Sequence, residues 1–327
     1  MCIRVVAPRT GRLAPLGAPL GHVPRALAPH LTHVRNGGRR YEVTVAVRDS
    51  RSEPGSARRA ARELADEDGA RIVLTMAGTR VLPAVTEACE EAAVPCVSTT
   101  FGLDDIAGLR RAVGGGLRGR CRRLPVERRP AGPAAAARAV RVPAGARPGA
   151  ATRRSTTRQA GLRPRLITCS RWLTYPHTHS SPAPDVHAEL GDARVATLVY
   201  WSPGHPYRSS LDGTTCAELA RAFQEATGAS WLQPLGLAHA LPATAHHALA
   251  TADDPADRAS VADAVARTRL DTVAGTLDWT GGPTPDIALL PLVGGQWQSG
   301  PDGPRLAVAH TAGHPEVPLT GDLTPAH

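Results

Sequence analysis

The chain has 327 residues, a net charge of +9 and a pI of about 10.0, and 42% of its residues are hydrophobic. This length predicts one large or two ordinary domains with room for a sizeable core. No apolar run approaches the roughly 18 residues that a membrane-spanning helix needs. The first eight residues lack the apolar region of a signal peptide, which leaves a cytoplasmic location open.

The positive charge is concentrated in one segment. Residues 107–165 contain 16 arginines and a single acid, Glu127, whereas 22 basic and 28 acidic residues lie elsewhere. All 38 cations are Arg and none is Lys, which indicates the coding bias of a GC-rich gene. The overall basicity therefore does not predict a nucleic-acid partner, although an arginine-rich arm that binds nucleic acid is an alternative for this segment.

The first hundred residues alternate between predicted strands and helices. Pro24 and Pro29 interrupt one helical pattern, so we expect a broken helix there. The alternation is the pattern of a doubly wound parallel sheet, which places the chain in the α/β class. The predicted strands are 2–7, 41–47, 70–75 and 94–97, the helices are 21–34, 54–68 and 81–93, and a Gly/Pro-rich loop covers 8–17.

Residues 69–101 organise this half of the chain, because they form a strand, a helix and a second strand. A right-handed crossover of this length makes the two strands parallel, so their carboxyl ends meet at the edge where α/β sheets bind ligands. Thr79 follows the first strand, and Ser98, Thr99 and Thr100 end the second. These hydroxyls, backbone N–H groups and a helix N-terminus predict a neutral site for a small anion such as a carboxylate. The site has no nucleophile–base pair, so we do not expect an enzyme.

Residues 107–165 interrupt the pattern, since they consist mainly of 16 Arg, 13 Ala, 9 Gly and 6 Pro. No aromatic residue lies between Phe101 and Trp172, and too little apolar surface remains to offset the entropy lost on folding. We expect 107–161 to be disordered, or to be a frameshifted part of a second domain. Reading the gene in its other two frames would test the second possibility.

Regular patterns return near residue 162. We expect strands at 164–169 and 195–201, helices at 211–227, 235–251 and 260–269, a turn-rich stretch at 270–297, and a frayed end after residue 309.

Other chemically tempting side chains are assigned structural roles. The six cysteines contain no Cys-x-x-Cys pair and no zinc-finger spacing, so the sequence predicts no metal and no cofactor. Cys89 and Cys96 are expected to be small buried side chains. Sequence proximity alone is no sign of a catalytic triad. The groups set aside in this way are His177, His179 and His187; His239, His246 and His247; Ser209 and Ser210 with His205 and Asp212; and Trp279 with Trp297.

A run of motifs in the second half resembles a known family. The stretches are 207–228, 233–241 and 270–275, followed by Asp278-Trp-Thr-Gly-Gly-Pro and Pro291-Leu-Val-Gly-Gly-Gln-Trp. They resemble the C-terminal half of ABC-transporter substrate-binding proteins of the branched-chain amino-acid (Leu/Ile/Val-binding-like) type, which are class I periplasmic binding proteins. The first-half unit fits the same family, so that the resemblance covers about 1–106 and 160–309.

The resemblance implies two α/β lobes, joined by three crossovers, that close on a small ligand. The implied division is a first lobe at 1–106, an incomplete second lobe at 107–161 and 162–234, a return to the first lobe at 235–309, and a tail at 310–327. The position of the family's ligand-pairing acid is occupied by Leu198. The implied ligand-binding residues are Ala77, Gly78, Thr79, Ser98, Thr99 and Thr100 in the first lobe, and Tyr200 and Trp201 in the second.

The resemblance also implies a function and a location. It predicts an extracytoplasmic, non-catalytic protein that captures an amino-acid-like or carboxylate ligand for an ABC permease in the membrane, with no nucleic-acid partner. Two alternatives are a soluble ligand-sensing module on the same fold and a decayed relic that no longer binds.

Overall fold

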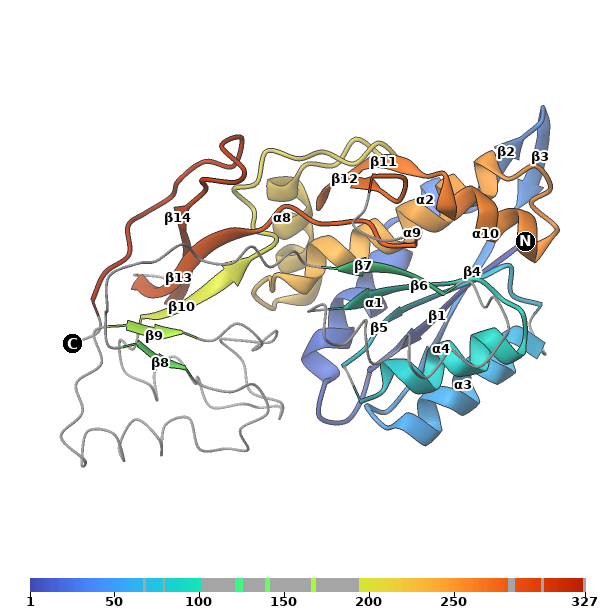
Figure 1. Cartoon of the computed structure of the whole chain (residues 1–327), viewed down its shortest axis with the longest axis horizontal. Helices are drawn as coiled ribbons and strands as arrows, with labels where there is room; N and C mark the ends of the chain where they lie inside the picture. The colour runs from blue at the N-terminus through green and yellow to red at the C-terminus, as the bar shows by residue number, and fades with distance from the viewer. Residues whose placement is uncertain are drawn as a thin grey trace.

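The computed structural model describes residues 1–66, 69–78, 80–100, 121–125, 139–141, 166–168, 194–281, 286–300 and 303–325. Within these residues the chain forms two five-stranded sheets, which lie at the two ends of the molecule in Figure 1. Each sheet has its own buried cluster of side chains. A larger third cluster joins the first sheet to the helices from the second half of the chain.

The first sheet has the strand order β4-β1-β5-β6-β7, and all of its strand pairs are parallel. Every residue of β5 is buried, because helices cover both faces of the sheet. The predicted doubly wound parallel sheet is therefore confirmed. The strands are β1 (Cys2–Ala7), β4 (Thr44–Asp49), β5 (Ile72–Met76), β6 (Cys96–Thr100) and β7 (Cys121–Pro125).

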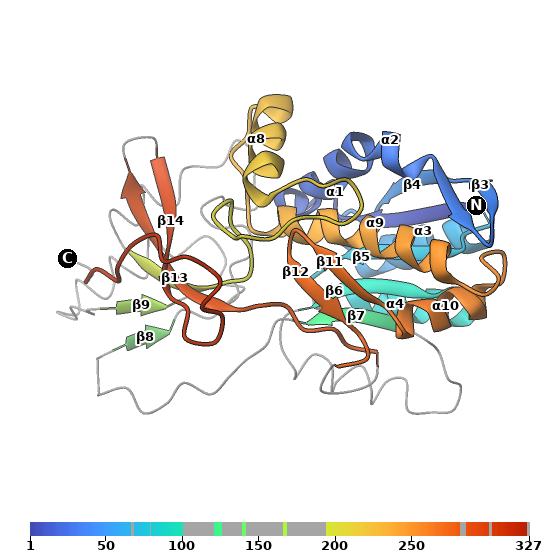
Figure 2. The ribbon, with the colours of Figure 1, turned by 90° about the horizontal axis from the view of Figure 1, so that it is seen from above.

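Helices α3 (Pro54–Asp66) and α4 (Leu82–Glu91) cover one face of this sheet, and α1 (Ala14–Ala26) and α9 (Pro234–Thr251) cover the other (Figure 2). The small side chains of α3 and α4, such as Ala57, Ala61 and Ala88, let these helices pack closely on the strands. Cys89 and Cys96 are buried in the same cluster, as predicted. Helix α10 (Arg258–Ala266) and the hairpin of β11 (Arg269–Thr272) and β12 (Gly275–Asp278) follow α9.

Helix α1 departs from the sequence prediction. It begins at Ala14 inside the predicted loop 8–17, and it contains Pro19 and Pro24. Pro15 favours the helix start, because a proline there removes an N–H that would have no partner in the helix. The expected break does occur, at Leu27, and α2 (Ala28–Leu31) follows it. A hairpin of β2 (His33–Asn36) and β3 (Arg39–Glu42) then leads into β4.

The second sheet has the strand order β14-β13-β10-β9-β8. Its strands β8, β9 and β10 are parallel, whereas β13 runs antiparallel to both β10 and β14. The stretch 270–297, expected to be turn-rich, also contains the short strands β11 and β12 and the start of β13. The strands are β8 (Ala139–Arg141), β9 (Leu166–Thr168), β10 (Val195–Val199), β13 (Val293–Gly300) and β14 (Gly303–His310).

Among the described elements, the chain changes from one sheet to the other at three points, between β7 and β8, between β10 and α9, and between β12 and β13. The structure differs here from the prediction that 107–161 belongs to the second lobe. Of its described residues, β7 pairs with β6 in the first sheet and β8 pairs with β9 in the second. The rest of this segment lies outside the described residues, as do the glycine run near 115 and the histidines 177, 179 and 187.

Helix α8 (Cys216–Thr227) lies between β10 and α9 in the sequence. Thr215 forms a capping box with Glu218 at its start, and Gly228 ends it in the left-handed conformation. Its side chain Phe223 contacts His22 of α1 edge-to-face, with ring centroids 5.3 Å apart. Among the described helices, none combines the length and apolarity that a membrane span requires.

The expectation of a frayed end after residue 309 is wrong. Val317 is buried, and the backbone of Thr320 donates to the carbonyl of Val308 at 2.9 Å. The side-chain amide of Gln296 donates to the carbonyl of Thr324 at 2.9 Å, and the N–H of Thr324 donates back to Gln296 at 2.9 Å. These bonds fasten the final described residues to the second sheet.

Candidate functional site

The carboxyl edge of the first sheet holds the first-lobe residues of the predicted site. Met76 of β5 lies opposite Thr99 of β6, so Ala77 and Gly78 run beside Thr100. The strand order reverses between β1 and β5, since the chain first adds β4 on one side of β1 and then β5 on the other. In open α/β sheets, ligands bind outside the carboxyl ends of the strands at a reversal of this kind.

Two loops lie against each other at this edge. A Cβ atom added to Gly78 would be only 2.8 Å from Cδ1 of Leu13, so the loop after β5 packs on the loop after β1. Ala77 is buried and Gly78 is half-buried. Thr79 and the side chain of Thr100 lie outside what the structure describes, so their roles stay predictions.

Ser98 and Thr99 place hydroxyl groups under this edge. They are 0% and 1% exposed, and within the described residues neither hydroxyl has a hydrogen-bond partner. Successive strand residues point to opposite faces. Val97 belongs to the cluster on the α1 and α9 side, and Cys96 belongs to the cluster on the α3 and α4 side. Thr99 therefore faces α9 and Ser98 faces α4, so these two hydroxyls serve opposite faces of the sheet.

Some N–H groups at the start of α4 are used within the turn that opens the helix. Val81 and Leu82 both donate to the carbonyl of Gly78, at 2.9 and 3.0 Å, and Ala84 donates to Val81 at 3.1 Å. Pro83 has no N–H. The helix start can still favour a negative charge through its dipole.

A cradle of N–H groups lies at the ends of β1 and β4, which sequence reasoning missed. The carboxylate of Asp49 accepts from the N–H groups of Arg9 at 2.9 Å, Thr10 at 3.2 Å and Arg51 at 2.8 Å, and from the Thr10 hydroxyl at 2.6 Å. Burial alone would raise the pKa of Asp49, but these hydrogen bonds outweigh it and lower the pKa. Asp49 thus takes up the N–H groups that could otherwise bind an anion, and its hydrogen bonds hold the loop in place.

Ser52 also links the loop after β4 to the loop after β1. Its hydroxyl accepts from the N–H of Leu13 at 2.9 Å and donates to the carbonyl of Thr10 at 2.8 Å. Gly11 has a φ of 79°, and a Cβ atom there would lie 2.4 Å from the Arg51 carbonyl oxygen. The loop after β1 is therefore locked to the loop after β4. The first residues of the Gly/Pro-rich loop 8–17 are thereby held beside the carboxyl end of β4.

The second-lobe candidates Tyr200 and Trp201 lie in a different environment, because they are only 3% and 0% exposed. The backbone N–H of Tyr200 donates to the side chain of Gln233 at 3.0 Å. Trp201 packs directly on α9, where a Cβ atom at Gly236 would be 2.2 Å from its Cδ1. In this structure the Tyr200 backbone and the Trp201 side chain connect the segment after β10 to the start of α9. A ligand contact from either one remains a prediction.

The side chains that were assigned structural roles are placed accordingly. Trp279 and Trp297 are each 3% exposed and pack in the core. Asp212 and His239 form a buried pair, with Oδ2 and Nε2 3.3 Å apart, and Thr214 donates to the same carboxylate at 2.6 Å. Within the described residues no cluster of His, Cys, Asp and Glu has a geometry that would hold a metal ion.

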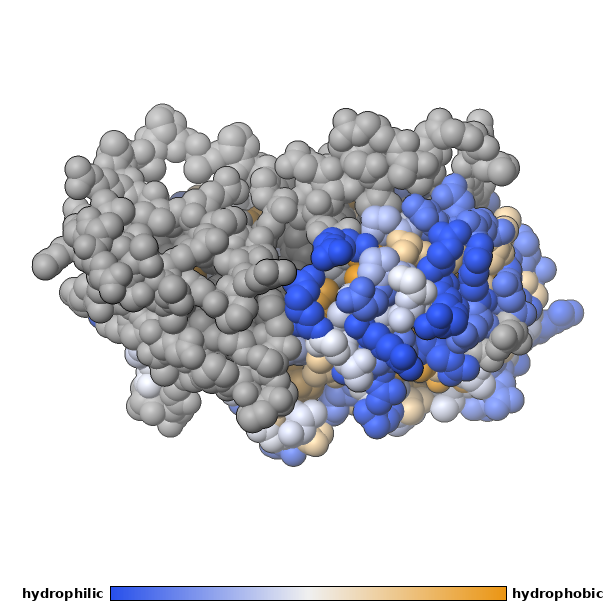
Figure 3. All heavy atoms as spheres, turned by 90° about the horizontal axis from the view of Figure 1, so that it is seen from below, coloured by the Kyte–Doolittle hydropathy of each residue, from blue (hydrophilic) through white to orange (hydrophobic). Residues whose placement is uncertain are grey.

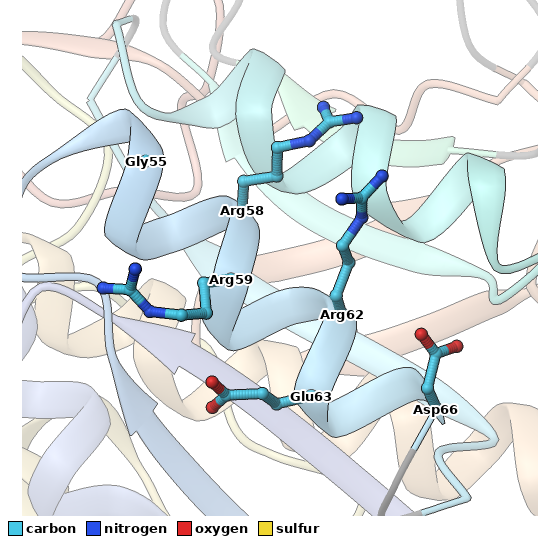
Figure 4. A pocket seen from close by; sticks show the side chains of 6 residues that line it. All are labelled: Gly55, Arg58, Arg59, Arg62, Glu63 and Asp66. Carbon is cyan, nitrogen blue, oxygen red and sulfur yellow. The ribbon is translucent and has the colours of Figure 1, made fainter.

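The outer face of α3 and α4 is mainly hydrophilic (Figure 3). It contains a shallow hollow of about 330 Å³ along α3, lined by side chains that include Arg58, Arg59 and Arg62 (Figure 4). Arg58 pairs with Glu87 of α4 at 3.0 Å, and both Arg58 and Arg62 pair with Glu91. These two arginines are engaged within the fold, so the hollow is a solvated helix surface.

No protein-family model matches the chain, and no curated protein matches it in sequence. Solved structures match it closely in fold. The branched-chain amino acid transporter substrate binding protein LivJ from Streptococcus pneumoniae, in complex with isoleucine, has a TM-score of 0.61 and 12% identity, and the match covers 95% of this chain and 99% of that one.

Two solute binding proteins of ABC transporters from Rhodopseudomonas palustris are similar as well. The one in complex with 3,4-dihydroxybenzoic acid has a TM-score of 0.65 and 15% identity, covering 99% of this chain and 98% of that one. The one in complex with 4-hydroxybenzoate has a TM-score of 0.64 and 13% identity, covering 98% of each chain. The chain therefore has the fold of class I periplasmic binding proteins, as the motifs predicted.

Proposed function

We propose that this protein is the substrate-binding component of an ABC-type importer, located outside the cytoplasm. It captures a small carboxylate between its two lobes and delivers it, unchanged, to a membrane permease. The observation that carries the proposal is that the hydroxyls of Ser98 and Thr99, near the carboxyl end of β6 and on opposite faces of the sheet, are buried without hydrogen-bond partners among the described residues. Buried polar groups normally have partners, and a ligand that accepts hydrogen bonds would supply them.

The chemistry of the edge favours a carboxylate. The hydroxyls are neutral donors, and the dipole of α4 places partial positive charge at its start. The ligands named for the similar structures, isoleucine and the two hydroxylated benzoic acids, share a carboxyl group. Leu198 stands where the resembled family has an acid, so the second lobe offers no partner there for an ammonium group. This favours a carboxylate without an amino group over an amino acid.

Closure of the two lobes would exclude water from the ligand and strengthen its hydrogen bonds. No residue described at the edge provides a nucleophile–base pair, and binding requires none. The proposed ligand contacts from the first lobe are Ala77, Gly78, Thr79, Ser98, Thr99 and Thr100.

Isothermal titration tests this function. The panel is leucine, isoleucine, benzoate, 4-hydroxybenzoate and 3,4-dihydroxybenzoate. We expect heat from at least one carboxylate, and an affinity about tenfold lower in Ser98→Ala or Thr99→Val, since each substitution removes one hydrogen bond. Thr244→Val is the matched control, because it removes a buried hydroxyl of α9 that bonds the Ala240 carbonyl at 2.9 Å. Absence of heat with every compound would contradict the proposal and indicate a non-binding relic.

A further inference from the structure

The edge strand β4 has a free side. In the described residues the first sheet ends at β4, which pairs with β1 alone. Figure 2 shows β4 at the border of the sheet, with α1 and α2 beside it. An edge strand presents backbone N–H and C=O groups that an additional strand can pair with. Natural sheets often prevent such pairing, so an open edge beside an apolar groove points to a partner.

An apolar groove of about 410 Å³ runs along this edge. Its floor is formed by Val43, Val45 and Val47, which occupy alternate positions and share one face of the strand. Pro24 and Leu31, from α1 and α2, form its wall. The floor extends over roughly 13 Å at the usual rise of a strand. Over this length an added strand could direct every second side chain toward the floor.

The groove is positively charged at its rim. Arg9 and Arg25 line it, both are exposed, and neither forms an ion pair with the residues that the structure describes. The Nε of Arg25 donates only to the Gly21 carbonyl of its own helix, at 3.0 Å. This differs from Arg58 and Arg62, whose charges are neutralised by α4. The two guanidinium groups at the rim can therefore pair with carboxylates of a partner.

The surrounding sequence extends this charge. Residues 1–53 contain nine arginines and three acids, whereas the chain outside 1–53 and 107–165 is acidic. The β2–β3 hairpin continues from the groove, since the N–H of Val43 donates to the Thr32 carbonyl at 2.8 Å. It presents three further exposed arginines, Arg35, Arg39 and Arg40. Positive charge thus continues beyond the groove along the hairpin.

We propose that β4 is a docking edge for an extended, acidic segment of a partner protein. The segment pairs its backbone with β4, places its alternate apolar side chains over Val43, Val45 and Val47, and directs its carboxylates to Arg9 and Arg25. Addition of a strand to a free edge is a common mode of peptide recognition. The length of the floor and the charge that continues along the hairpin favour a peptide over a small amphipathic carboxylate. The groove shares Arg9 and the loop after β1 with the carboxyl edge of the sheet, but its floor lies on β4, so the inference does not depend on the proposed ligand.

The probes are four dye-labelled ten-residue peptides that alternate Glu with Val, Ile, Leu or Phe. Their matched controls carry Lys in place of each Glu. Fluorescence anisotropy with the full-length chain is expected to show binding of an acidic peptide, none of the Lys peptides, and weaker binding at higher salt. Hydrogen exchange of the amides in 44–49 should slow when the acidic peptide binds, because a new strand protects them.

The decisive variant is Arg9→Glu combined with Arg25→Glu, for which we expect an affinity at least about tenfold lower. Arg59→Glu combined with Arg221→Glu reverses two exposed charges elsewhere and should leave the affinity unchanged. The proposal is overturned if no acidic peptide binds, if both double variants bind equally, or if 44–49 exchange at the same rate with peptide. Competition by decanoate with no protection of 44–49 would identify a small-molecule groove instead. Concentration-dependent dimerisation lost in the Arg9 and Arg25 variant would identify a second copy as the occupant.

Discussion

At the scale of single residues, the hydroxyls of Ser98 and Thr99 are buried without hydrogen-bond partners among the described residues. An unsatisfied buried polar group costs about 1–3 kcal/mol. We therefore predict that Ser98→Ala leaves the free energy of unfolding of the ligand-free protein unchanged, or raises it by up to about 1 kcal/mol. Urea unfolding measures this directly.

The matched control for that prediction lies on the neighbouring strand. The hydroxyl of Thr75 donates to the Val6 carbonyl at 2.9 Å, so Thr75→Val should lose about 1 kcal/mol. If Ser98→Ala destabilises the ligand-free protein as much as Thr75→Val does, the Ser98 hydroxyl has a structural partner and its place in the ligand site is untenable.

The indole of Trp201 leaves no room for a side chain at position 236. Because a Cβ atom at 236 would lie 2.2 Å from Trp201 Cδ1, Gly236→Ala must displace α9 or the ring. We predict a loss of about 2 kcal/mol or more in the free energy of unfolding, which is typical of an overpacked core. Gly21→Ala in α1, where nothing lies within 4 Å, should instead stabilise by about 0.5–1 kcal/mol. Equal effects of the two substitutions in urea unfolding would refute the close packing.

At the scale of elements, one arginine joins α10 to the first sheet. The guanidinium of Arg258 donates to the carbonyls of Ala65 at 2.9 Å, Ala70 at 3.0 Å and Ala92 at 2.8 Å. The first and last of these lie where α3 and α4 end, and helix ends leave carbonyls without internal partners. Arg258 therefore satisfies three backbone groups from three different segments.

We predict that Arg258→Met lowers the free energy of unfolding by about 3 kcal/mol, because buried carbonyls then lose charged donors. Arg267→Met is the matched control, since that side chain is 55% exposed and its pair with Asp253 is exposed as well. It should change stability by less than about 0.5 kcal/mol. Chemical denaturation of both variants tests this, and a small loss in Arg258→Met would show that the bonds to α3 and α4 are dispensable.

The sequence predicted best those elements whose apolar residues recur with one clear period and face one buried environment. The buried run of β5 and the helical pattern of α4 are of this kind, and their order fixes the parallel sheet. The start of α1 was missed because Pro19 and Pro24, which argue against a helix locally, are tolerated where α1 packs on α9. At the edge of the sheet, Ser98 and Thr99 were identified as candidates because they lie at the end of a predicted strand. Asp49 was missed because its partners at 9 and 10 are distant in sequence and spacing does not reveal them.

At the scale of the whole molecule, full or partial burial favours the neutral form of several histidines. Burial lowers the pKa of His205 to about 4 from 6.5, although its bond to Ser202 and the charge of Glu316 act in the opposite direction. Burial also lowers the pKa of His246 and His247 in α9, and the His30 charge adds to the effect on His246. Protons then bind more tightly to the unfolded chain than to the folded one.

The sign of the resulting pH dependence follows from this difference. Above pH 6.5 these histidines are neutral in both states and cost no stability. As the pH falls from 6.5 toward 4, the unfolded chain takes up protons that the folded chain refuses, so the free energy of unfolding decreases. For His205 the interval from 6.5 to about 4 corresponds to roughly 3 kcal/mol. Asp212 adds a further loss only below its ordinary pKa, because its hydrogen bonds with His239 and Thr214 outweigh burial and lower its pKa.

Urea unfolding at pH 7, 6, 5 and 4 tests the prediction. The wild-type free energy of unfolding should decline steadily over this range, and His205→Phe should decline less steeply, by roughly 3 kcal/mol over the whole interval. The comparison concerns the slope, so any constant loss from removing the 2.8 Å contact between His205 and Ser202 does not affect it. His310→Gln, at an exposed position, should retain the wild-type slope. If His205→Phe follows the wild-type curve in parallel, His205 accepts its proton without leaving the fold, and the acid sensitivity must arise in α9.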